Sequence, residues 1–198
     1  MLRGSCRYCK APISILYPFI EILTSILLTA LVLSAPTTFL FGYFFFFSAL
    51  IVTIRSDLET MLISRFVTLF LVPIGFLLSW LHVIPLSFQE SILGAFSGFI
   101  FLFLIAKLFT FFTGKHGMGQ GDIDLIAFIG SFIGISGCWV TLFIGSFMGS
   151  IVGIIYIITA KPGPSAKIPF GPFLALGAMS YVLLQKPIIE MMLKLHTP

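Results

Sequence analysis

Carboxylates in an otherwise apolar chain are the side chains best suited to do chemistry in this sequence. The chain holds seven acidic residues, which are Glu21, Asp57, Glu59, Glu90, Asp122, Asp124 and Glu190. Charges in or beside membrane helices are costly, so each is a candidate for function. Two adjacent carboxyl groups can activate water against a peptide bond without a metal, because one is ionised and accepts a proton while the other stays protonated and polarises the carbonyl. We consider Asp57 and Asp122 for these roles.

The approach to Asp122 is rich in glycine. Gly117, Gly119 and Gly121 precede it at every second position. Glycine permits close backbone approach, so these residues would let a substrate strand lie against the loop and shape a cleft. An equally good interpretation is that Asp122 only caps the helix that follows. A phosphate-binding loop is not indicated, because neither the GK[ST] signature nor a preceding strand is present.

The other acidic residues have plainer interpretations. For Asp57 taken alone, a solvated loop charge is the simpler interpretation. We expect Glu59 and Asp124 to be charges at the membrane boundary. Glu21 lies inside the first apolar segment, where it either pairs with Lys107 as a structural partner or contributes to the substrate cleft, and the sequence favours the structural pairing.

Three cysteines are present. Cys6 and Cys9 form a CxxC pair, which has the spacing of half a zinc site, whereas a closed structural zinc site needs four ligands. Cys138 stands alone in an apolar stretch, where packing is its expected role. Three cysteines with one close pair do not make a disulfide framework.

Composition places all these residues in a membrane protein. The chain has 198 residues, of which 59% are hydrophobic and only 9% are charged, against about 25% charged in an average soluble domain. Seven apolar segments approach the length of a membrane-spanning helix, and they are 18–35, 39–54, 66–83, 92–112, 123–136, 139–160 and 169–184. We therefore expect an all-α, polytopic membrane helix bundle of about seven transmembrane helices, with a turn at Gly137.

Glycines spaced four residues apart indicate close helix packing within this bundle. The expected domains are a cytoplasmic remnant with the CxxC pair (1–17), the transmembrane domain (18–184) and a C-terminal tail (185–198). The net charge of +4 is scattered along the chain. It therefore suits membrane orientation and does not predict nucleic-acid binding.

Lysine and arginine set the expected orientation. If the N-terminus is cytoplasmic, the inner segments are 1–17, 55–65, 113–122 and 161–168. These segments hold most of the 11 basic residues, namely Arg3, Arg7, Lys10, Arg55, Arg65, Lys115, Lys161 and Lys167. Because positive charges favour the cytoplasmic side, Asp57 and Asp122 are expected at the same cytoplasmic membrane face.

Five segments, in order along the chain, resemble motifs of the bacterial type IV prepilin peptidase family, the GxGD-type membrane aspartyl peptidases. They are 2–9, with its CxxC; 17–21, a tyrosine-proline-x-x-glutamate; 56–59, around Asp57; 114–122, ending in Gly119-Gln120-Gly121-Asp122; and 168–172, Ile-Pro-Phe-Gly-Pro. The resemblance implies that Asp57 and Asp122 form a catalytic pair. It also implies cleavage, at the cytoplasmic membrane face, of a short basic leader that precedes the hydrophobic helix of a pilin or pilin-like secretion subunit. Many members then methylate the new N-terminus with S-adenosylmethionine.

The sequence departs from this family pattern in three ways. The family usually begins with one more membrane helix and a first cysteine pair, so we expect either a short form or a start that is placed too late. Zinc at Cys6 and Cys9 would then need a second cysteine pair from elsewhere, and S-adenosylmethionine-dependent methylation is not expected. Ser64 and Arg65 stand where a proline and an acid are frequent, and Asp124 stands where a lysine is common. The last change predicts the loss of a positive charge near the site and reduced activity.

The sequence thus predicts a peptidase of the bacterial inner membrane that needs no cofactor and acts on prepilins or pilin-like type II secretion subunits. One alternative is a non-catalytic pilin-binding or assembly relative. Another is a small transporter, which the clustering of acids at one interface disfavours. Membrane lipid is the other expected partner. Neither the particular pilin, nor the oligomeric state, nor which aspartate is acid and which is base follows from the sequence.

Overall fold

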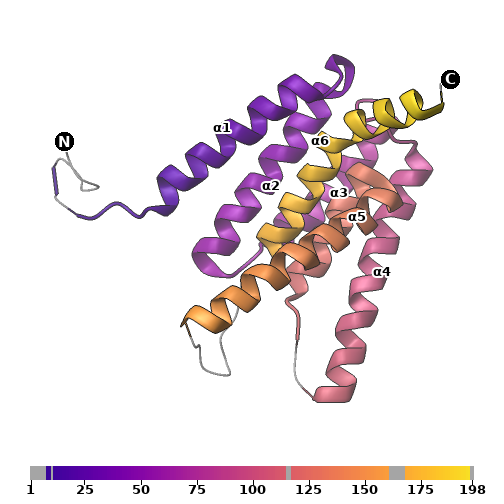
Figure 1. Cartoon of the computed structure of the whole chain (residues 1–198). Coiled ribbons are helices and arrows are strands. Elements are labelled where there is room, and N and C mark those ends of the chain that lie inside the picture. Colours follow the sequence, from indigo (N-terminus) through magenta and orange to yellow (C-terminus); the bar gives the residue numbers. More distant parts are fainter. Residues whose placement is uncertain (1–7, 10, 115–116, 161–167, 197–198) are drawn as a thin grey trace.

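The computed structural model describes residues 8–9, 11–114, 117–160 and 168–196, with side chains except at 66–67 and 186–196. Within these ranges the fold is all-helical and contains no β-strand, as expected (Figure 1). The elements are α1 (Leu16–Ser34), a 3-10 turn (Thr37–Phe39), α2 (Leu40–Thr60), α3 (Arg65–Trp80), α4 (Phe88–Thr113), α5 (Gln120–Ala160) and α6 (Gly171–His196).

The helices have the length and surface of a membrane bundle. Four helical spans in the described residues are long and apolar enough to cross a membrane, and they are Leu16–Ser34, Thr37–Thr60, Phe88–Thr113 and Gln120–Ala160. Large apolar side chains such as Phe41, Phe111 and Phe143 point outward and are 72%, 82% and 76% exposed. Such a surface suits lipid and not water. The bundle is therefore multi-pass, but the predicted count of seven spans is not confirmed, because α3 and the apolar part of α6 are shorter.

Helix α5 is interrupted by a turn at Gly134. Gly134 has φ 71° and ψ −172°, which is outside the helical region. Beyond it the chain doubles back, so that the Cys138 Sγ atom lies 3.7 Å from the Ile126 carbonyl oxygen. In one straight helix, residues 12 apart would be separated by about 18 Å. The turn expected at Gly137 is thus at Gly134, and Gly137 is instead buried against Ile133.

Glycines allow the helices to approach closely. A Cβ atom at Gly94 of α4 would clash with the backbone of Gly130 in α5, and one at Gly98 would lie 2.9 Å from the Cys138 sulfur. Cys138 is 1% exposed and fills this contact, so its predicted packing role agrees with its surroundings. On the other side of α5, a Cβ atom at Gly177 of α6 would lie 2.8 Å from the Thr141 carbonyl oxygen.

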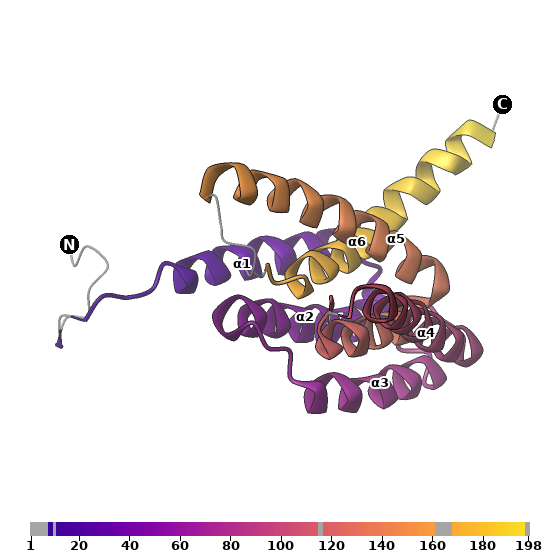
Figure 2. The same cartoon turned by 90° about the horizontal axis from the view of Figure 1, so that it is seen from below.

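An aromatic cluster joins α2 to the first arm of α5. Phe46 and Phe132 stack with ring centroids 4.9 Å apart, and Phe128 contacts both rings. All three side chains are buried. Figure 2 shows α1 and α3 on opposite sides of α2. The cluster therefore fixes the central helix α2 against α5, and these two helices carry Asp57 and Asp122.

Candidate active site

Asp57 and Asp122 line one cavity. Asp57 is in the last turn of α2, and Asp122 is in the first turn of α5. The cavity has a volume of about 550 Å³ and is lined by residues 56–57, 60–65 and 119–122. Three parts of the chain thus form its walls: the end of α2, the turn into α3, and the start of α5.

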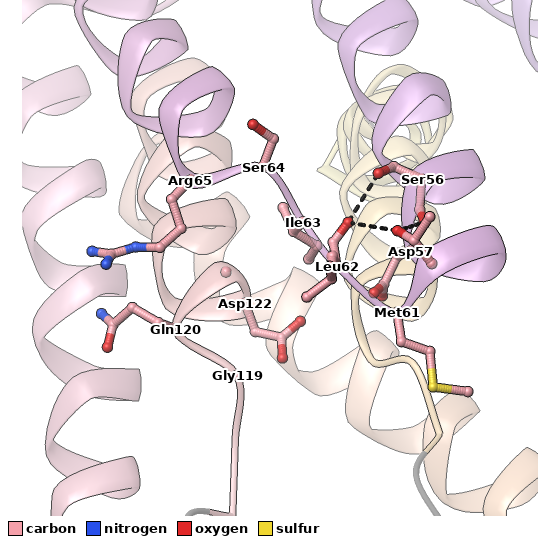
Figure 3. Close-up of a pocket in the computed structure, with 12 residues that line it drawn as sticks. Ser56, Asp57, Met61, Leu62, Ile63, Ser64, Arg65, Gly119, Gln120 and Asp122 are labelled. Carbon is pink, nitrogen blue, oxygen red and sulfur yellow. Dashed lines mark hydrogen bonds between the residues drawn. The ribbon is translucent and has the colours of Figure 1, made fainter.

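The two carboxyl groups are directed into the same space (Figure 3). They are close enough for their charges to interact. Asp57 is 5% exposed, and Asp122 is half-buried. Neighbouring carboxyl groups with little access to water do not readily ionise together. The structure brings together the two residues that the sequence singled out.

The carboxyl group of Asp57 has a partner from a third helix. The backbone N–H of Gly171, the first residue of α6, donates a hydrogen bond to Asp57 Oδ2 at 3.1 Å. A Cβ atom at Gly171 would lie 2.7 Å from this oxygen and 2.8 Å from the Ile63 side chain. Only glycine therefore lets α6 begin so close to Asp57. Sequence reasoning noted Gly171 only as part of a motif and gave it no role.

Asp122 both begins a helix and faces the cavity. Its backbone N–H donates a hydrogen bond to the Gly119 carbonyl oxygen at 3.3 Å, and its carboxyl group accepts one from the Gly119 backbone N–H. Asp122 is the third residue of α5, a position where an acidic side chain supports the helix start. The two interpretations of Asp122 are therefore compatible, because the contact with Gly119 also fixes the carboxyl group at the cavity.

Of the three glycines before Asp122, only two line the cavity. Gly119 and Gly121 line the cavity, and a Cβ atom at Gly121 would lie 2.8 Å from Ile63. Gly117 does not line it. A Cβ atom there would clash with the ring of Phe109 in α4. Gly117 thus packs against α4 and is not among the cavity-lining residues, so its role in the substrate cleft stays a prediction.

Glu21 lies away from the two aspartates. It lines a separate cavity of about 130 Å³ together with Tyr17, Arg55 and Glu59. No ion pair joins Glu21 to Lys107 among the described residues, and the Lys107 ammonium instead lies 5.6 Å from the centre of the Phe103 ring. The expected ion pair with Lys107 is therefore not seen among the described residues, and Glu21 lines a different cavity from Asp57 and Asp122, so its role in the substrate cleft stays a prediction.

Asp124 is not the boundary charge that was expected. Its side chain is fully buried, and its Oδ2 atom lies 2.7 Å from Arg65 Nε. Glu59, in contrast, is half-exposed and pairs with Arg55 at 3.5 Å, as a boundary charge would. Arg65 also lines the cavity. The Arg65 guanidinium therefore supplies a positive charge beside the site, while the effect of Asp124 on activity stays a prediction. Sequence reasoning missed the pair because its partners stand 59 residues apart.

The zinc half-site cannot be placed, because Cys6 lies outside the described residues. Cys9 is exposed and has a free thiol. In the part of the chain that the structure describes, no group of three or more histidine, cysteine or acidic side chains is arranged to hold a metal ion. The CxxC pair stays a prediction.

Two models of known protein families match parts of this chain. The sequence model of the Type IV leader peptidase family matches residues 44–154, and that of the Bacterial Peptidase A24 N-terminal domain matches residues 1–35. No solved structure matches the chain.

Curated relatives match most of the chain. The chain is 35% identical over 176 residues to the prepilin leader peptidase/N-methyltransferase of Aeromonas hydrophila, covering 88% of this chain and 60% of the relative. It is 36% identical over 181 residues to the protein of that name from Xanthomonas campestris pv. campestris, covering 89% and 61%. For the Legionella pneumophila protein the identity is 34% over 184 residues, covering 90% and 62%. The chain thus spans about 60% of the length of the first of these relatives. These matches confirm the resemblance carried by the five motifs: the chain belongs to the type IV leader peptidase family.

Proposed function

We propose that this chain is a membrane-embedded aspartyl endopeptidase that removes the leader peptide from type IV prepilins or pilin-like type II secretion subunits. The main observation that supports this proposal is that Asp57 and Asp122, from two different helices, direct their carboxyl groups into one cavity of about 550 Å³. The family assignment and the names of the relatives support this substrate class.

In the proposed mechanism the two carboxyl groups share one proton and hold a water molecule between them. The ionised carboxylate accepts a proton from the water as its oxygen attacks the carbonyl carbon of the peptide bond, and the protonated carboxyl group donates to the carbonyl oxygen. When the C–N bond breaks, a proton passes to the leaving amine. The Gly171 N–H stabilises negative charge on Asp57 and so favours it as the initial base.

The proposed site opens at the cytoplasmic face of the bacterial inner membrane. Arg55 and Arg65 stand at the two ends of the segment that lines the cavity, and Lys115 precedes Gly119 in the sequence, so basic residues in these segments favour the cytoplasmic side. The apolar helix of the substrate would enter from the lipid while its basic leader stays in the cytoplasm. The peptidase step needs no cofactor. Zinc binding at Cys6 and Cys9 is proposed only where a second cysteine pair joins them.

Leader removal from a prepilin tests this function. The full chain is co-expressed with a prepilin from the same bacterium, and the pilin mass is followed over time. Asp57→Asn and Asp122→Asn should each slow cleavage by about 10²- to 10⁴-fold, since each removes one partner in proton transfer.

Wild-type cleavage rates in either variant would contradict the catalytic assignment. A wild-type chain that binds the prepilin and leaves it uncut would contradict the peptidase function and favour an assembly role.

A further inference from the structure

An ion pair joins the two chain segments that carry the catalytic candidates. Arg65 is the first residue of α3, directly after the turn that follows Asp57 and α2. Asp124 lies two residues beyond Asp122 in α5. The 2.7 Å contact between Arg65 Nε and Asp124 Oδ2 therefore connects the α2–α3 turn to the start of α5.

Burial makes Asp124 dependent on Arg65. The Asp124 side chain is fully buried, and its second oxygen, Oδ1, has no hydrogen-bond partner among the described residues. Arg65 supplies the ion pair that compensates this buried charge, while its own side chain is 57% exposed. A buried charge without a partner is strongly unfavourable, so the contact holds the exposed arginine in place.

The turn between Asp57 and Arg65 is fixed at its other end too. The Met61 N–H donates to the Asp57 carbonyl at 2.9 Å, and the Ser56 hydroxyl donates to the Leu62 carbonyl at 2.9 Å. Ile63 fills the space left by the missing side chain at Gly121. The turn is thus tied to α2 by hydrogen bonds and to α5 by the ion pair.

We propose that the Arg65–Asp124 ion pair is a positioning device that sets the separation of the Asp57 and Asp122 carboxyl groups. The inference rests on the proposed function. Figure 3 shows the Arg65 side chain directed away from both carboxyl groups, so it acts through the backbone that carries them. Arg65 and Asp124 are positioning residues and take no part in proton transfer.

Arg55 and Glu59 provide a matched control. Their contact is 3.5 Å long and joins residues four apart within α2, with side chains 45% and 50% exposed. Such a pair cannot set the distance between two helices. Arg55→Gln removes the same charge as Arg65→Gln and lies one residue from the cavity wall.

The pH profile of cleavage reports the separation of the carboxyl groups. Interaction between two carboxyl groups drives their apparent pKa values apart, and only the singly protonated pair is active, so a closer pair gives a broader bell-shaped profile. The full chain in liposomes cleaves a purified prepilin at a series of pH values. Arg65→Gln should lower kcat by about 10- to 100-fold, since small misplacements of reacting groups have large effects on rate, and should narrow the profile.

Further variants distinguish a loss of positioning by the ion pair from a loss of folding. Arg65→Lys keeps the charge and should recover most of kcat and the profile width. The double variant Arg65→Gln with Asp124→Asn leaves no unpaired buried charge, so it should fold, yet it should keep the narrowed profile. Arg55→Gln should leave the width unchanged. A loss of rate at unchanged width, or a rise in KM alone, would overturn the inference.

Cross-linking tests the spacing between the α2–α3 turn and the start of α5 without measuring cleavage. Leu62→Cys, in the turn between α2 and α3, and Gln120→Cys, at the start of α5, both line the cavity. In a chain with Cys6→Ser and Cys9→Ser, they are joined by a short bismaleimide. The Arg65→Gln change should reduce the cross-linked fraction at least threefold relative to Arg55→Gln. Equal cross-linking would overturn the positioning role. This result is independent of cleavage, so failure of the proposed function and failure of the inference are distinguishable.

Discussion

At the scale of single residues, Gly171 can lie close to the Asp57 carboxyl group because it has no side chain. Its N–H reaches Asp57 Oδ2 at 3.1 Å because nothing occupies the position where a Cβ atom would lie 2.7 Å from that oxygen. The hydrogen bond and the close approach depend on each other. A larger residue loses both, since the carboxyl group must move away to make room.

Gly171→Ala should therefore impair the site. The added methyl group displaces the Asp57 carboxyl group or the Ile63 side chain, so cleavage should slow by about 10²-fold and stability should fall by about 1–3 kcal/mol. Prepilin cleavage and thermal unfolding in detergent measure the two effects. Gly153→Ala is the control, because a Cβ atom there would meet only Ile168, at 3.6 Å. Equal rates in the two variants would contradict this role of Gly171.

The sequence could predict the pairing of Asp57 with Asp122 but not the groups around them. The distribution of basic residues placed both aspartates at one membrane face, and the ordered motifs joined them. The contacts of Asp57 with Gly171 and of Asp124 with Arg65 span 114 and 59 residues. No periodicity or local spacing encodes such contacts, because they follow from how the helices pack.

At the scale of elements, the turn at Gly134 divides α5 into two arms that pack against each other. The sequence predicted two helices here from the length of the apolar stretch, and the turn between them is real. Gly130, Gly134 and Gly137 all lie close to this turn in the sequence. Sequence alone does not distinguish which of them adopts a positive φ and which two serve close packing, so the turn was expected three residues too late.

Gly134→Ala should destabilise this element. The backbone at φ 71° and ψ −172° is essentially restricted to glycine, and another residue there costs about 1–3 kcal/mol. The variant should unfold at lower temperature or denaturant concentration than wild type, with Gly153→Ala in the same helix as the reference. An unchanged unfolding midpoint would show that the chain does not need glycine at this turn.

At the scale of the whole molecule, the apolar exterior and the helices long enough to span a bilayer make a multi-pass membrane protein. Helix α1 buries only Leu31, so its surface is mostly available to lipid. Composition predicted this class without any motif. The number of spans was harder to predict, because an apolar segment that packs within the bundle and one that crosses the whole bilayer have the same composition.

Labelling of single cysteines checks the proposed orientation. Leu62→Cys, in the turn beside the cavity, should react with a membrane-impermeant maleimide only from the cytoplasmic side. His82→Cys, in the exposed turn after α3, should react only from the periplasmic side. Inverted and right-side-out vesicles give the two measurements, in a background with Cys6→Ser and Cys9→Ser. The reverse pattern would place the aspartates on the periplasmic face.

The hydrogen bond from α6 to α2 also has a consequence for biosynthesis. Both aspartates have left the ribosome once α5 has been made, yet the amide that holds one of them belongs to the helix that comes next. A nascent chain interrupted after α5 thus carries two acids without the contact that orients them. If the chain is the proposed peptidase, its site would be complete only after α6 docks, so an unfinished chain would lack an oriented catalytic pair.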